Sequence, residues 1–180
     1  MVQLILACIA IGIFTAYCIV ACCLFGVPIS LSHTYYYYNE RYPGTGWVFT
    51  AMIVVVSFML VYPWIYATHQ VSSWSHWFGF LPFLCCAMLV FVAFAPNARN
   101  KWVQQVHMIC AKLAAVFAIL WICIVCWKIM YVLPAWILLC GGVAHLTHTA
   151  KTCRDWWWEM VAFGATFTCI IVELVLALNK

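Results

Sequence analysis

The feature that most constrains this chain is a series of six long apolar runs, separated only by short polar segments. A helix needs roughly 20 apolar residues to cross the hydrocarbon core of a bilayer, and each run approaches or exceeds that length. The pattern therefore predicts an all-α, polytopic membrane protein, with six transmembrane helices in one bundle and a single domain over residues 1–180. The predicted spans are Leu4–Val27, Trp47–Ala67, Trp77–Ala95, Val106–Trp127, Tyr131–Leu146 and Trp156–Leu178.

The fourth and fifth runs need a separate argument, because the sequence is almost continuously apolar from Val106 to Leu146. A single helix of that length would measure about 60 Å, which is twice the thickness of the hydrocarbon core. Lys128 interrupts the run, and Pro134 follows at the point where a new helix would begin. Because proline is tolerated in the first turn of a helix, we expect a hairpin here.

The composition favours a membrane protein and argues against several other classes. Hydrophobic residues make up 69% of the chain and charged residues only 7%, which is too little charge to solvate a soluble domain. The net charge of +4 arises from scattered Lys and Arg without a dense basic tract, so no nucleic-acid partner is expected. Of the 12 cysteines, all except Cys153 fall in apolar runs, where we expect them to pack as small hydrophobes.

The distribution of basic residues among the loops predicts an orientation. The first, third and fifth loops carry five of them, against two on the opposite side. The five are Arg41, Arg99, Lys101, Lys151 and Arg154, and the two are Lys128 and Lys180. Because basic loops tend to remain in the cytoplasm, this bias favours those three loops inside and both termini outside.

Many polar and ionisable residues also fall beside the first, third and fifth loops. Because these loops share one face of the membrane, we expect their side chains to occupy one depth zone as a polar cluster. Its predicted members are Ser30, Ser32, His33, His107, Lys112, His145, His148 and Glu159. Since a charge in hydrocarbon is costly, we expect Lys112 either to pair with Glu159 or Asp155 or to snorkel to the membrane surface.

His145 and His148 are candidate metal ligands, because residues three apart on a helix project within about 60° of each other. Together with His107 or His33 they would supply three ligands, and a nearby acid would then serve as general base. His107 facing His145 would alternatively suit a haem. Histidines that are hydrogen-bonded or face lipid headgroups explain the same pattern. The chain contains no GxSxG, HExxH or phosphate-binding loop, and we predict no cofactor.

Three short motifs resemble a known membrane family. The first span ends with Pro28-Ile29-Ser30-Leu31-Ser32, the fourth opens with His107-Met108-Ile109-Cys110-Ala111 and continues to Phe117, and the sixth opens with Glu159-Met160-Val161-Ala162-Phe163-Gly164. Their order resembles the six-span DRAM-like family of damage-regulated autophagy modulators and GPI-anchor remodelling factors. Uncharacterised small membrane proteins of Bacteroidetes and their phages look similar. The resemblance implies lipid handling or membrane trafficking, with Ser30, His107 and Glu159 at matching positions, and location in a bacterial inner membrane.

Two functions follow from the residues, and the first is favoured. It is a non-enzymatic integral membrane protein that binds a lipid headgroup or a membrane partner through the polar cluster. The second is a metal-dependent membrane hydrolase acting on a lipid, with His107, His145 and His148 beside Glu159 or Ser30. Membrane lipids are the expected partners, and a second copy of the chain or another membrane protein is a further candidate. Small residues would allow close helix contacts at Gly12, Gly141, Gly142 and Gly164.

Overall fold

The computed structural model describes residues 1–95 and 101–179, and within these ranges the chain is helical and contains no β-strand. The α-helices are α1 (Val2–Phe25), α2 (Thr34–Arg41), α3 (Trp47–Val71), α4 (Phe80–Phe94), α5 (Lys101–Ile124), α6 (Val132–Leu146) and α7 (Arg154–Leu178). Two short 3-10 helices, η1 (Ser75–Phe78) and η2 (Trp127–Ile129), precede α4 and α6.

Six helical segments in the described part of the chain are long and apolar enough to cross a membrane. They are α1, α3, η1 with α4, α5, η2 with α6, and α7, and they coincide with the six predicted spans apart from a few residues at the ends. The predicted all-α, six-span architecture is therefore confirmed. The chain is a multi-pass integral membrane protein.

Glycine and proline mark two of the boundaries. After α1, Gly26 adopts a φ of 73° and donates its backbone N–H to the carbonyl of Cys22, and glycine takes this positive φ without steric cost because it lacks a Cβ. Pro134 lies in the first turn of α6, directly after η2. The predicted hairpin between the fourth and fifth spans is thus confirmed.

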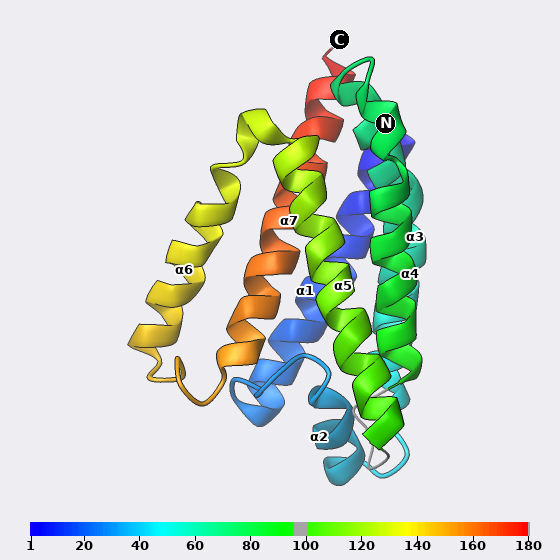
Figure 1. The fold of residues 1–180 in the computed structure, drawn as a ribbon. Coiled ribbons are helices and arrows are strands. Elements are labelled where there is room, and N and C mark those ends of the chain that lie inside the picture. The colour runs from blue at the N-terminus through cyan, green and yellow to red at the C-terminus, as the bar shows by residue number, and fades with distance from the viewer. Residues whose placement is uncertain (96–100, 180) are drawn as a thin grey trace.

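The helices do not all have the same number of neighbours. α3 packs against α1, α4 and α7, while α5 packs against α4 and α7. α6 packs mainly against α7 and stands at the edge of the bundle (Figure 1). The start of α1 and the end of α7 lie at one end of the bundle, whereas α2 and the α6–α7 connection lie at the other (Figure 1). We refer to the latter as the α2 end.

The predicted orientation depends on which face of the membrane the α2 end occupies. Arg41, Lys101 and Arg154 belong to elements that begin or end there. Arg99 and Lys180, which also entered the charge comparison, lie outside the described residues. Both termini outside therefore stays a prediction.

The sequence did not predict α2, because its four consecutive tyrosines lack the spacing of an amphipathic helix. In the structure Tyr38 is buried and packs against Tyr17 and Phe25 of α1. The hydroxyls of Tyr17 and Thr34 are also hydrogen-bonded to each other. These contacts attach α2 to the end of α1, and burial raises the pKa of Tyr38 above its usual value.

Of the four glycines expected at close helix contacts, Gly164 fulfils the prediction. A Cβ at Gly164 would lie 2.6 Å from the ring of Trp136 on α6, so the α6–α7 contact requires glycine at that position. For Gly12, Gly141 and Gly142 the prediction was wrong, because no other atom lies within 4 Å of the place a Cβ would occupy. These three residues are exposed and face away from the neighbouring helices.

Candidate functional site

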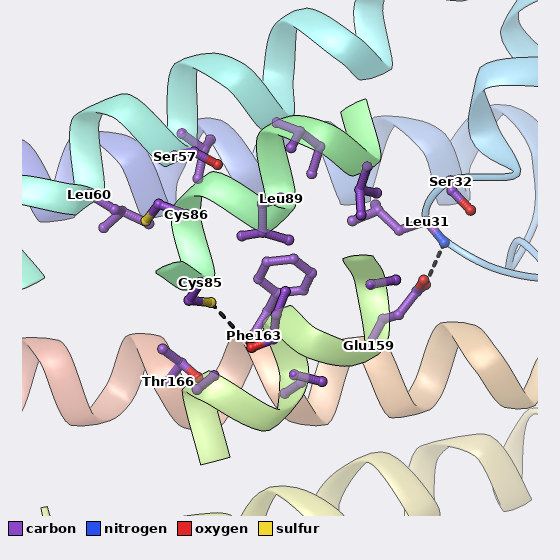
Figure 2. Close-up of a pocket in the computed structure, with 18 of the residues that line it drawn as sticks. Leu31, Ser32, Ser57, Leu60, Cys85, Cys86, Leu89, Glu159, Phe163 and Thr166 are labelled. Carbon is purple, nitrogen blue, oxygen red and sulfur yellow. Dashed lines mark hydrogen bonds between the residues drawn. The ribbon is translucent and has the colours of Figure 1, made fainter. Parts of the chain in front are cut away.

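A cavity of about 240 Å³ lies inside the bundle, with residues of α3, α4, α5 and α7 around it. Its lining is mostly apolar and includes Phe49. Leu89 and Phe163 also line it (Figure 2). At the α2 end it is bordered by the segment that follows α1, and on α3 its lining extends as far as Trp64. Because the α3 residues that line it run from Phe49 to Trp64, the cavity extends roughly 22 Å along the helices.

The carboxylate of Glu159, near the start of α7, holds the segment that borders the cavity. Its Oε2 accepts a hydrogen bond from the backbone N–H of Leu31 at 2.6 Å (Figure 2). Leu31 is buried and Glu159 is half-buried, so this bond is largely removed from solvent. This short hydrogen bond fixes the Leu31 backbone at the cavity wall.

Two further contacts join the same segment to the start of α7. The backbone N–H of Trp156 donates to the carbonyl of Ile29 at 3.0 Å. The thiol of Cys153 donates to the carbonyl of Val27 at 3.2 Å. Cys153 was expected in a loop, and it does precede α7, but its side chain is buried against the first connection.

Of the predicted cluster members in this segment, only Ser32 lines the cavity. The hydroxyls of Ser30 and Ser32 lie 3.2 Å apart at hydrogen-bonding distance, and Ser30 also accepts from the backbone N–H of His33. The ring of His33 instead packs against Tyr36 and Tyr37 of α2. Ser30 and His33 therefore shape the connection, while Ser32 contributes a hydroxyl to the cavity wall.

His107 on α5 is buried, lines the cavity and makes contacts with the end of α4. Its Nδ1 lies 2.8 Å from the carbonyl oxygen of Ala95, and the carbonyl of Val92 is a second partner of the ring. Because a carbonyl only accepts, the ring nitrogen donates and satisfies a backbone group that the end of a helix leaves free. His107 thereby ties α5 to α4.

Lys112 lines the same cavity from α5, but its side chain is exposed. Across the described ranges no ion pair within 4 Å joins Lys112 to Glu159 or Asp155, and Asp155 instead lies 3.6 Å from Arg154. The exposed Trp158 of α7 also lines the cavity. With two exposed residues on α5 and α7 in its lining, the cavity reaches the surface of the bundle between these helices.

His145 and His148 lie apart from the cavity, at the end of α6 that faces the α2 end of the bundle. Both side chains are exposed, and neither residue lines the cavity. α6 packs mainly against α7, so its histidines are not brought to His107 on α5. Among residues 1–95 and 101–179, no three His, Cys, Asp or Glu side chains form a group that would hold a metal ion.

Two polar side chains deeper in the cavity did not enter the predicted cluster. Ser57 and Trp64 of α3 both line it, and each is only 2% exposed. Seven residues separate them, which places them two turns apart on one face of the helix. Within the described part of the chain, Ser57 Oγ and Trp64 Nε1 are buried without a hydrogen-bond partner. The sequence indicates these two residues only weakly, because a single serine and a tryptophan within an apolar run are ordinary in a membrane span.

Trp121 on α5 is a buried tryptophan in the same region whose indole N–H has a hydrogen-bond partner. Its Nε1–H donates to Thr68 Oγ1 at 2.8 Å, and Thr68 in turn donates to the carbonyl of Trp64. The rings of Trp64 and Trp121 pack edge to face with centroids 5.3 Å apart. The two tryptophans are thus neighbours, but only the N–H of Trp121 has a partner.

Comparison of the chain with protein-family models, with curated proteins and with solved structures finds no match. The geometry of the cavity is therefore the basis for assigning a function.

Proposed function

We propose that this protein is a lipid-binding membrane protein that holds one amphipathic lipid in the cavity between α3, α4, α5 and α7. The observation that carries the proposal is the distribution of its lining. The hydrophilic side chains Ser32, His107 and Glu159 lie towards the α2 end, and Lys112 adds an exposed charge about midway along α5, while the rest of the lining is mostly apolar. A site with an apolar body and a few polar groups at one end matches the shape of a lipid.

In this arrangement the headgroup lies at the α2 end and the tail extends towards the middle of the membrane, while Lys112 extends its side chain towards the headgroup from roughly 16 Å along α5. Lys112 provides an exposed ammonium at the place where the cavity reaches the surface, and its long side chain can direct this charge towards the headgroup zone. The carboxylate of Glu159 already accepts from Leu31, so it contributes mainly to the shape of the wall. A phosphate or carboxylate headgroup would complement Lys112.

The motif resemblance supports the same proposal. The DRAM-like family implies lipid handling, and two of the three matching positions, His107 and Glu159, line the cavity. The third, Ser30, is hydrogen-bonded to Ser32 at its edge. We propose membership of that group of six-span proteins together with lipid binding.

The test measures lipid retained by the purified protein with native mass spectrometry. Ala118 is buried and lines the cavity, so Ala118→Phe places a ring inside it. The next residue, Ile119, is 40% exposed and does not line the cavity, which makes Ile119→Phe a matched control. We expect wild type and Ile119→Phe to retain one lipid per chain and Ala118→Phe to lose most of it.

Equal retention by all three proteins would overturn the proposal, as would the absence of any retained or added lipid in the wild type. Circular dichroism and size-exclusion chromatography confirm that each variant is folded. If Ala118→Phe does not fold, Ala115→Leu provides a smaller obstruction at another lining position of α5.

A further inference from the structure

We propose that the deep part of the cavity is a polar subsite, formed by Ser57 and Trp64, that recognises a carbonyl oxygen carried within the apolar body of the ligand. This inference rests on the proposed lipid binding and specifies the ligand. It also predicts that the cavity prefers a ligand with a carbonyl group to one without, which a cavity for plain acyl chains would not do.

The indole of Trp64 restricts the chemistry of the ligand most strongly. An indole N–H only donates, so its partner must be an acceptor. Trp64 is almost completely buried in a membrane-spanning helix, where no bulk water is available to take that role. An unpaired donor in such a place is unfavourable, and a ligand oxygen in the cavity would satisfy it.

Ser57 adds a second hydrogen-bonding group on the same face of α3. Its hydroxyl can either donate or accept, so it is compatible with a second oxygen of the ligand. A serine within a helix often bonds to the carbonyl one turn earlier, yet Ser57 Oγ is without a partner among the described residues. Two buried, unpartnered groups therefore border one apolar space (for Ser57, Figure 2).

The depth of these residues excludes the ester groups of an ordinary phospholipid. Ser57 lies ten residues beyond the start of α3, or roughly 15 Å along the helix, which is about half the thickness of the hydrocarbon core. Trp64 lies roughly 25 Å along the helix, past the middle of the membrane as seen from the α2 end. A phospholipid with its headgroup at the α2 end keeps its ester carbonyls near that surface. The ligand that fits has a carbonyl further along its apolar body, as in a long-chain ketone or a lipid quinone.

The aromatic residues around this region suit a flat carbonyl-bearing group. Phe163 and Phe167 of α7 line the cavity together with Trp64. Aromatic side chains pack favourably against planar rings in offset or edge-to-face arrangements. The carbonyl is the shared chemistry of the ketone and the quinone, and the experiment below separates the two.

The experiment uses the full-length protein in nanodiscs, with isotope-labelled indole nitrogens observed by NMR. Trp64→Phe identifies the Trp64 indole signal, and Trp121 serves as an internal reference because its N–H already bonds to Thr68. Three probes are added: decylubiquinone, methyl undecyl ketone and tridecane, which has no oxygen. Native mass spectrometry measures how tightly each probe is retained.

We expect a carbonyl probe to move the Trp64 indole proton downfield, while tridecane causes no such shift and the Trp121 signal changes little. We also expect Ser57→Ala and Trp64→Phe each to weaken retention of that probe by roughly twofold to tenfold, which is the usual contribution of one hydrogen bond. Retention of tridecane should be the same in the wild type and both variants. A response to decylubiquinone alone would assign a quinone ring, and a response to both would assign the carbonyl itself.

The inference is overturned if the probes displace the resident lipid but tridecane binds as well as the carbonyl probes, or if both variants retain the wild-type preference. In either case lipid binding itself stands. If no probe binds and Ala118→Phe also leaves lipid retention unchanged, both proposals fail together. Ser57→Ala removes one hydroxyl and Trp64→Phe keeps an aromatic ring of smaller size, and circular dichroism verifies the folding of both.

Discussion

The two ends of the cavity differ in how their polar atoms are satisfied. Near the α2 end, Glu159 accepts from Leu31 and His107 donates to Ala95. Deeper in the bundle, within the described residues, the hydroxyl of Ser57 and the indole N–H of Trp64 have no partner in the protein. Polar groups of the first kind hold the fold together, because their removal would leave a buried partner unsatisfied. Groups of the second kind gain no hydrogen bond from the protein, and in the proposal above a ligand provides it.

The largest effect that this comparison predicts is at Glu159. Glu159→Ala leaves the buried N–H of Leu31 without an acceptor, so we expect a loss of about 1.5–3 kcal/mol in the free energy of unfolding. Glu159→Gln keeps an acceptor oxygen and should lose clearly less. Reversible unfolding in detergent micelles measures both. Equal losses would mean that Leu31 does not depend on an oxygen at this position.

A somewhat smaller effect on stability is expected at His107, and it distinguishes this buried histidine from the exposed His145. His107→Ala should cost about 1–2 kcal/mol, because the carbonyl of Ala95 loses its donor. His145→Ala serves as the control and should change stability by less than about 0.5 kcal/mol, since its side chain is exposed at the end of α6. Thermal unfolding of the two variants side by side provides the measurement. A comparable loss in His145→Ala would contradict the positions described above.

The neighbouring tryptophans sharpen the comparison at the deep end. Trp121→Phe removes the donor to Thr68 and should destabilise the lipid-free protein by about 1 kcal/mol. Trp64→Phe removes an N–H that has no protein partner, so the lipid-free protein should lose less stability than Trp121→Phe does. The reverse order in unfolding experiments on delipidated protein would show that the Trp64 N–H contributes to folding.

The smallest expected effect is the coupling between Lys112 and Glu159. No ion pair within 4 Å joins them in the part of the chain that is described, so Lys112→Ala and Glu159→Ala should be additive within about 0.5 kcal/mol. A double-mutant cycle on unfolding free energies tests this. A coupling above about 1 kcal/mol would establish the buried pair that the sequence offered as one alternative for Lys112.

The sequence was sufficient to predict the spans, because bilayer thickness sets the length of an apolar run. It also placed Ser32, His107, Lys112 and Glu159 on one face, and the structure brings all four to one cavity. This grouping follows from the alternation of the spans, because six spans determine which loops share one face of the membrane.

The sequence was not sufficient to predict which helices touch. Lipid-facing and buried positions are both apolar in a membrane, so hydrophobic periodicity does not identify neighbours. The histidines of α6 were grouped with His107 on depth alone, and the packing of α6 against α7 separates them. Ser57 and Trp64 were missed for a related reason, since only their surroundings distinguish them from ordinary residues of a span.

The contacts between the first connection and the start of α7 have a consequence for the order of biosynthesis. Leu31 and Glu159 are 128 positions apart, and Val27 and Cys153 are 126 apart. Because translation proceeds from the N-terminus, the first connection is synthesised well before α7. While the intervening spans are translated, the N–H of Leu31 has no Glu159 to accept from it, and the carbonyl of Val27 has no Cys153 to donate to it. Insertion of α7 thus provides these partners and closes the cavity at its α2 end.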